Sequence, residues 1–147
     1  MKKTKMARIK IIYPEKTLFT HELSVRVTDL NYGNHLAHDS IISLMHEARA
    51  QFFAANGMSE LDIEGAGIIM ADLAINYRAE AHFGQLLIIE IALNEFSKKG
   101  CDMFYRILCK ETGTVVAIAK TGLVFFDYSE KKPVAVPTSF LKIARTV

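Results

Sequence analysis

Four strand-like runs follow one another between Gly67 and Asp127, and this stretch limits the possible folds more than any other feature of the chain. The runs cover roughly residues 68–80, 86–97, 101–110 and 114–127, with Gly84, Gly100 and Gly113 between them. The links at 98–100 and 111–113 are short enough to be hairpin turns. Consecutive strands joined so tightly must run antiparallel.

Two elements are expected before these strands. Residues 19–28 alternate between apolar and polar side chains, and this period of two predicts a half-buried strand. Its apolar face consists of Phe19, Leu23, Val25 and Val27. Residues 39–56 follow helical spacing, which predicts one long helix with Asp39 or Ser40 as its N-cap and Gly57 at its end. The apolar stripe of this helix consists of Ile41, Leu44, Met45, Ala48, Phe52 and Phe53.

One strand, one long helix and then four strands form an α+β pattern, which we assign to one domain of residues 1–147. A curved antiparallel sheet of five or six strands would wrap around the helix, because the helix is apolar on more than one side. A short helical turn is expected at 59–63 and a last one at 138–145. Residues 86–89 are apolar on both faces of their strand, so we expect a second subunit to cover the other face.

Composition limits the partners and the location of the protein. A net charge of +2 gives no electrostatic case for nucleic acid as the main partner. No apolar run reaches the ~18 residues of a membrane span, and no signal-peptide pattern follows the basic residues 2–10, which we expect to be a solvated terminus. Cys101 and Cys109 fit neither a metal site nor a bridge within one strand, so we expect free thiols in the cytoplasm.

The junction between the first strand and the helix carries a family resemblance. Residues 25–36 read Val-Arg-Val-Thr-Asp-Leu-Asn-Tyr-Gly-Asn-His-Leu, and Glu47-Ala48-Arg49 follow on the helix. This text resembles the 4-hydroxybenzoyl-CoA thioesterase branch of the hotdog superfamily, and residues 76–80, 84 and 126–137 extend the match over nearly the whole chain. The resemblance implies a hotdog fold and hydrolysis of an acyl thioester of coenzyme A or acyl carrier protein. It also implies a homodimer or homotetramer without a cofactor, in which the carrier's pantetheine arm is part of the substrate.

The chain departs from the family pattern at the residue that is often the catalytic carboxylate. That position holds Asn31, which cannot act as a base or nucleophile but can donate and accept hydrogen bonds. Glu80 matches a site glutamate of plant acyl-ACP thioesterases, which are also hotdog proteins. His38 matches a site histidine of the Tol-Pal-associated hotdog thioesterases.

Thioester hydrolysis needs a polarised carbonyl and an activated water, and these needs assign the candidate residues. The start of a helix offers free amides, so we expect the backbone of residues 34–37 to hold the carbonyl oxygen. His35 would orient the substrate or donate to it, and Asn31 would position the carbonyl or a water. The candidates for the base are Glu80, which we favour, Asp39 and His38. The substrate-binding candidates are Tyr32, Gly33, Asn34 and Arg78.

Each candidate also has a structural alternative. Asp39 could be the helix N-cap alone, Glu80 a solvated charge at a strand end, and His38 a structural neighbour. For Asp29 we prefer hydrogen bonds to turn amides, and Glu47 and Arg49 are expected to anchor the helix. His46 and His82 have no evident partners in the sequence, no metal site is expected, and Lys98 and Lys99 are weak candidates for phosphate binding.

Two other functions fit the same pattern. A hotdog dehydratase or hydratase would use His35 or His38 with Asp39 on a hydroxyacyl or enoyl thioester. A non-catalytic acyl-thioester binding protein is favoured by the loss of a carboxylate at Asn31.

Overall fold

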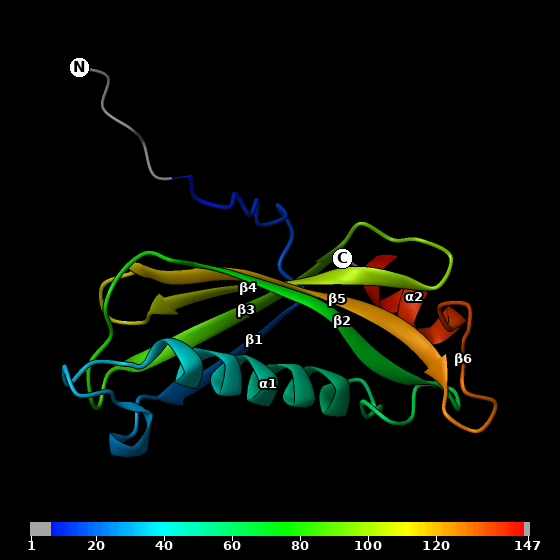
Figure 1. The fold of residues 1–147 in the computed structure, drawn as a ribbon, viewed down its shortest axis with the longest axis horizontal. Coiled ribbons are helices and arrows are strands. Elements are labelled where there is room, and N and C mark those ends of the chain that lie inside the picture. Colours follow the sequence, from blue (N-terminus) through cyan, green and yellow to red (C-terminus); the bar gives the residue numbers. More distant parts are fainter. Residues whose placement is uncertain (1–6, 146–147) are drawn as a thin grey trace.

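The computed structural model describes residues 7–145, which form one antiparallel sheet with a long helix packed on one face (Figure 1). The strands are β1 (Phe19–Ser24), β2 (Gly67–Tyr77), β3 (Leu86–Asn94), β4 (Gly100–Cys109), β5 (Val115–Asp127) and β6 (Lys132–Pro133). The helices are the 3₁₀ turn η1 (Val27–Asp29), α1 (His38–Ala55) and α2 (Thr138–Arg145). The expected α+β class, the six strands and the helix after Pro137 are confirmed, whereas residues 59–63 form turns instead of a helical turn.

The strand order places β2 at an edge of the sheet. The order is β1-β3-β4-β5-β2, and β6 pairs with the end of β5. The hairpins β3–β4 and β4–β5 confirm the expected tight antiparallel links. However, β2 pairs with β5 along Gly67–Tyr77 instead of with β3, which follows it in the chain. The segment between β2 and β3 therefore crosses one end of the sheet, and it passes the start of α1 there.

The core lies between α1 and the sheet. The whole predicted apolar stripe of α1 is buried, and inward residues of β3 and β4 such as Ile89, Tyr105 and Ile107 face it. Burying an aliphatic or aromatic side chain of this size stabilises a fold by about 1.5–3 kcal/mol. The sheet covers only one side of α1 within a single chain, because Ile42 and Glu47 on the outward side of the helix remain exposed. Gly57, with φ of +70°, follows the C-cap Asn56 and ends the helix as predicted.

Strand β1 stops four residues before the predicted end. Phe19, His21 and Leu23 are half-buried while Thr20 and Ser24 are exposed, so the alternation is confirmed there. Beyond Val25 the chain turns out of the sheet into η1, and Val27 is 68% exposed instead of buried.

The carboxylate of Asp29 causes this turn. It accepts hydrogen bonds from the backbone N–H and the guanidinium of Arg26, at 2.8 Å and 3.1 Å. A side-chain acceptor that satisfies the first free amide favours a helical turn over a continued strand. Asp29 therefore stabilises the turn before the 31–34 loop by bonding to Arg26. Its carboxylate does not bond to the backbone amides of the loop that follows, as had been expected.

The segment before β1 lies over the outer face of the sheet, away from α1. The Arg106 guanidinium stacks on the Tyr13 ring at 4.2 Å and pairs with Glu90 at 2.7 Å. Phe104 and Ile118 on this face are each only 7% exposed, so part of the cover expected from a second subunit comes from the chain itself. Arg8 and Lys10 are exposed as predicted, and the other basic residues of the N-terminal cluster lie outside the described range.

Two further sequence expectations concern cysteines and membranes. Cys101 and Cys109 are both buried free thiols, as predicted, and burial raises the pKa of Cys101 to about 12. Among residues 7–145, neither helix has the length and apolar character that crossing a membrane requires.

Candidate active site

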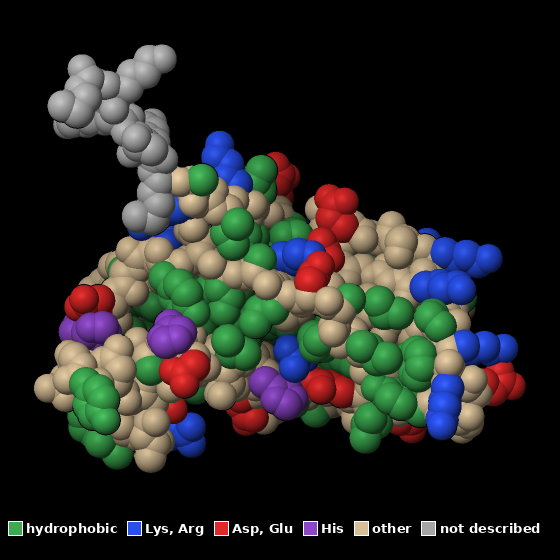
Figure 2. Space-filling model, viewed as in Figure 1, with side chains coloured by type: hydrophobic (Ala, Val, Ile, Leu, Met, Phe, Trp, Pro, Cys, Tyr) green, Lys and Arg blue, Asp and Glu red, His purple; other side chains and the backbone are tan. Residues whose placement is uncertain are grey.

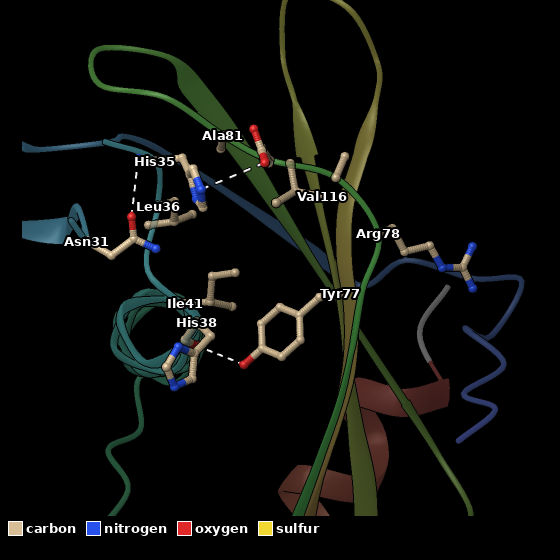
Figure 3. A pocket seen from close by; sticks show the side chains of 11 residues that line it. Asn31, His35, Leu36, His38, Ile41, Tyr77, Arg78, Ala81 and Val116 are labelled. Carbon is tan, nitrogen blue, oxygen red and sulfur yellow. Dashed lines mark hydrogen bonds and ion pairs between the residues drawn. The ribbon is translucent and has the colours of Figure 1, made fainter. Parts of the chain in front are cut away.

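A pocket of about 430 Å³ opens at the start of α1, between the loop before that helix and the segment that leaves β2. Figure 3 shows its walls: the loop and α1 on one side, and the chain from Tyr77 to Ala81 on the other. Five of the predicted site residues line it, namely Asn31, His35, His38, Arg78 and Glu80. Their apolar companions are Leu36, Ile41, Tyr77, Ala79, Ala81 and Val116.

The loop before α1 is a closed turn built around Asn31. The Asn31 N–H donates to the carbonyl of His35 at 3.0 Å, and the Asn34 N–H donates to the carbonyl of Asn31 at 3.0 Å. The Asn31 Oδ1 atom also accepts from the N–H of Gly33 at 2.9 Å. Asn34 has φ of +63°, a conformation that asparagine adopts more readily than most residues. The hydrogen bonds to turn amides that were expected of the Asp29 side chain are therefore made by the Asn31 side chain.

These bonds fix which way the Asn31 amide points. Because its oxygen must face the backbone donor, its nitrogen faces the opposite way. In Figure 3 that nitrogen faces the space between His35 and Ile41. Asn31 therefore presents two N–H donors, and no proton acceptor, to the pocket.

His35 and Glu80 face each other across the pocket. The His35 Nε2 atom lies 3.7 Å from Glu80 Oε1, and the two side chains are 32% and 65% exposed. The imidazole also lies against Gly33, where a Cβ atom would come 3.0 Å from Nε2. Gly33 therefore leaves room for the ring of His35, although it does not line the pocket itself.

His82 joins this pair, and the sequence interpretation missed it. Its Nε2 atom lies 4.0 Å from Glu80 Oε2, and the backbones of His35 and His82 form an isolated antiparallel bridge. The expectation that His82 has no partners is therefore wrong, and His46 likewise lies 3.4 Å from the carboxylate of Glu60. The available signal was spacing, because residues two apart on an extended chain point the same way, as Glu80 and His82 do.

Tyr77 is a second residue that the interpretation missed. Its hydroxyl donates to the carbonyl of His38 at 2.8 Å, which ties the end of β2 to the first residue of α1. Burial raises the pKa of Tyr77, and the negative charge of Asp39 raises it further. The phenol therefore stays protonated and keeps this hydrogen bond at neutral pH.

The free amides at the start of α1 lie later in the chain than expected. The N–H groups of Leu36 and Ala37 donate to the carbonyls of Ala81 and Asp29, and those of residues 33–35 bond to Asn31. The expectation that residues 34–37 hold a substrate oxygen is therefore wrong. Within the described range, the N–H groups of His38, Asp39 and Ser40 have no acceptor, as is usual for a first helical turn.

The remaining predicted residues fall into two groups. Ala37, not Asp39 or Ser40, is the N-cap of α1, and it provides no side-chain cap. Asp39 lies in the first turn of α1, outside the pocket lining. There its negative charge interacts favourably with the positive end of the helix dipole. Tyr32, Gly33 and Asn34 form the exposed tip of the loop and do not line the pocket.

The basic candidates are not gathered at the pocket. Arg78 lines it, but its guanidinium donates to Asn76 at 2.9 Å and points away from the histidines in Figure 3. Lys98 and Lys99 lie between β3 and β4, at the opposite end of β3 from the segment that borders the pocket. Among the residues that the structure describes, no three His, Cys, Asp or Glu side chains are grouped to hold a metal ion.

The helix anchors predicted on α1 differ from each other. Arg49 is 7% exposed and donates to Glu60 at 2.7 Å and to the Tyr105 hydroxyl at 3.1 Å, so its anchoring role is confirmed. Glu47 is exposed and accepts a hydrogen bond from Gln51 on the same helix, and within residues 7–145 it forms no hydrogen bond or ion pair with another element, so its expected anchoring role is not confirmed.

Comparison with known proteins agrees with this architecture. The family model of the thioesterase-like superfamily matches residues 25–143. A 1,4-dihydroxy-2-naphthoyl-CoA thioesterase from Synechocystis has a TM-score of 0.80 at 20% identity, over 88% of this chain and 96% of its own. A DHNA-CoA thioesterase from Staphylococcus aureus has a TM-score of 0.73 at 18% identity, over 86% and 87%. These structural likenesses confirm the hotdog fold, and the search among curated proteins gave no match.

Proposed function

The chain belongs to the thioesterase-like superfamily, and we propose that it hydrolyses an acyl thioester of coenzyme A or acyl carrier protein to a free acid and a thiol. The observation that carries this proposal is the pocket at the start of α1. On its loop and helix wall, the described residues leave hydrogen-bond donors without partners, and His35 on that wall faces the carboxylate of Glu80 on the opposite wall.

The donors would stabilise the carbonyl oxygen as it becomes negative. The candidates are the N–H groups of the first turn of α1 and the side-chain N–H of Asn31. Both are held in place before a substrate arrives, which is the condition under which such donors accelerate acyl transfer. The positive end of the helix adds to their effect.

Glu80 and His35 would handle the protons. Glu80 would take a proton from the attacking water, whose oxygen then forms a bond to the carbonyl carbon. When the C–S bond breaks, the leaving thiolate must receive a proton, and His35 lies close enough to Glu80 to pass it on. The released water proton thus ends on the thiol, and the carbonyl carbon keeps the water oxygen.

The pocket also has a place for the acyl group. Leu36, Ile41 and Val116 provide apolar walls, and the acyl chain would lie against them. The pantetheine arm would leave through the mouth, where Glu80 and His82 are exposed. No separate cofactor is needed, because the carrier is part of the substrate.

We also propose that the protein is a homodimer, or a homotetramer built from such dimers. The free edge of β2 has eleven residues, and Ile69, Met70 and Leu73 on it are exposed; Met70 and Leu73 border the same surface hollow as Ile42 of α1. Figure 2, which faces this side, shows apolar side chains gathered over the sheet above α1, with histidine and charged side chains along α1 itself. A second copy that pairs its own β2 there would cover both the unpaired backbone and these side chains.

A cytoplasmic location is part of the same proposal. The two cysteines are buried free thiols, which suits a reducing compartment.

The direct test is thiol release from a panel of aliphatic and aromatic acyl-CoA substrates, followed with Ellman's reagent. The proposal predicts catalytic release of free coenzyme A from at least one substrate together with the matching acid. Tight binding without release over hours would instead support the acyl-thioester binding protein that Asn31 allows. Loss of the double bond of a 2-enoyl-CoA without thiol release would support a hydratase.

A further inference from the structure

The carboxylate of Glu80 lies between two imidazoles. Its Oε1 atom is 3.7 Å from Nε2 of His35, and its Oε2 atom is 4.0 Å from Nε2 of His82. The two rings meet edge to face, with centroids 6.4 Å apart. Each carboxylate oxygen therefore faces a different imidazole at ion-pair distance, longer than a hydrogen bond, while the Glu80 side chain stays 65% exposed.

The backbone around His82 holds this arrangement in place. The N–H of His82 donates to Oε1 of Gln85 at 2.7 Å, and the N–H of Gln85 donates back to the carbonyl of His82 at 3.1 Å. Gly84 turns the chain with φ of +81° and donates to the carbonyl of Val25 at 2.9 Å. The segment is thus tied to the chain just after β1, so the position of His82 does not depend on its exposed ring.

An exposed glutamate needs such support to act as a base. Its side chain has several rotatable bonds and loses much conformational freedom when it is held in one rotamer. A single contact through Oε1 would leave the carboxylate free to turn about its last bond. A second contact through Oε2 restricts that rotation.

We propose that His82 is a positioning residue for the hydrolysis. It holds Oε2 of Glu80 so that Oε1 stays directed toward His35 and the attacking water. This inference rests on the proposed function, with Glu80 as the base. Among the residues that the structure describes, the ionisable side chains paired with Glu80 are these two histidines.

Steady-state kinetics of thiol release with the full chain tests the role. His82→Ala should lower kcat about 10-fold and change KM less than twofold, because the substrate can still bind while the base is loosely held. His82→Gln keeps an N–H donor and should recover most of kcat. The matched control is His46→Gln, since His46 is similarly exposed and lies 3.4 Å from a carboxylate, but that carboxylate is Glu60 and not Glu80; it should match the wild type.

NMR of the histidine rings in the resting protein gives a readout that does not depend on turnover. Glu80→Gln should move the ring signals of both His35 and His82 and leave those of His46 in place. The role of His82 would be overturned if kcat were unchanged in His82→Ala, or if His82→Gln did not restore the lost kcat. It would also be overturned if the ring signals of His82 did not move in Glu80→Gln. These outcomes leave hydrolysis by the wild type standing, whereas a wild type without thiol release would end both proposals.

Discussion

At the scale of single residues, Asn31 determines both the shape of the loop and the chemistry that the pocket can perform. Its oxygen is used by the turn, so only its N–H groups reach the pocket. Sequence reasoning identified the missing carboxylate at this position, but not that the turn itself orients the amide.

Asn31→Asp tests this orientation. Aspartate can still accept the hydrogen bond from Gly33, so the turn should persist, but it places a negative charge where the account needs a donor. Loss of one donor to a developing oxyanion costs about 10²-fold in kcat in known cases, and we expect a fall of that order. Circular dichroism should show an intact fold. Equal or higher turnover would show that position 31 prefers a base to a donor.

A second prediction at the scale of single residues concerns Asp29 and the dependence of stability on pH. Burial alone would raise its pKa, but hydrogen bonds from the side chain and backbone of Arg26 outweigh burial and hold the pKa below its usual value. A carboxylate whose pKa is lowered by folding stabilises the protein above its unfolded pKa, about 3.9, and loses that effect as the pH falls through the lower folded value.

Asp29→Asn should therefore reduce the free energy of unfolding by about 1.5–3 kcal/mol at pH 7, the range for hydrogen bonds to charged groups. The difference from the wild type should shrink as the pH is lowered below about 4, because the wild-type carboxylate then becomes neutral as well. Urea denaturation at a series of pH values measures both. A difference that stays constant down to the acid transition would refute the assignment.

At the scale of secondary structure, periodicity predicted the elements well, but their ends depended on particular side chains. The stripe on α1 and the hairpins were correct because apolar spacing reflects burial directly. The end of β1 was wrong because the carboxylate of Asp29 forms a turn, and short-range hydrogen bonds of this kind leave no periodic signal. The N-cap of α1 was wrong because backbone bonds of the loop hold the helix start at Ala37.

Arg49 links α1 to the sheet and to the loop that follows the helix. It bonds to Glu60 and to Tyr105, whose hydroxyl is 2.8 Å from that of Thr121. Arg49→Ala should reduce the free energy of unfolding by about 3 kcal/mol, since it leaves a buried phenol and a partly buried carboxylate short of partners. His46→Gln, at the exposed edge of the same group, is the control and should change stability little. Equal effects of the two variants in urea denaturation would contradict this account.

At the scale of the whole molecule, sequence reasoning found the fold class, the family and most of the polar residues that line the pocket. It could not place β2 beside β5, because the partner of an edge strand depends on the crossing of a chain segment and not on local pattern. That same crossing brings the segment of Glu80 and His82 to the start of α1, which is why His82 was missed.

The proposed dimer gives a prediction at this scale. Leu73→Lys places a charge on the exposed part of β2 and should shift the protein from dimer to monomer in analytical ultracentrifugation. Ile12→Lys is the matched control, because Ile12 is more exposed still but lies in the segment before β1. A monomeric wild type, or a Leu73→Lys dimer as tight as the wild type, would contradict an interface along β2.

In the proposed reaction, hydrolysis takes place between Glu80 and the first turn of α1. The most direct measurement is single-turnover release of coenzyme A by Glu80→Gln, compared with Glu47→Gln on the exposed side of the helix. Removal of the general base should slow the chemical step by about 10²-fold or more, while acyl-CoA binding and the Glu47→Gln rate stay close to those of the wild type. A Glu80→Gln protein that releases coenzyme A at the wild-type rate would contradict the account.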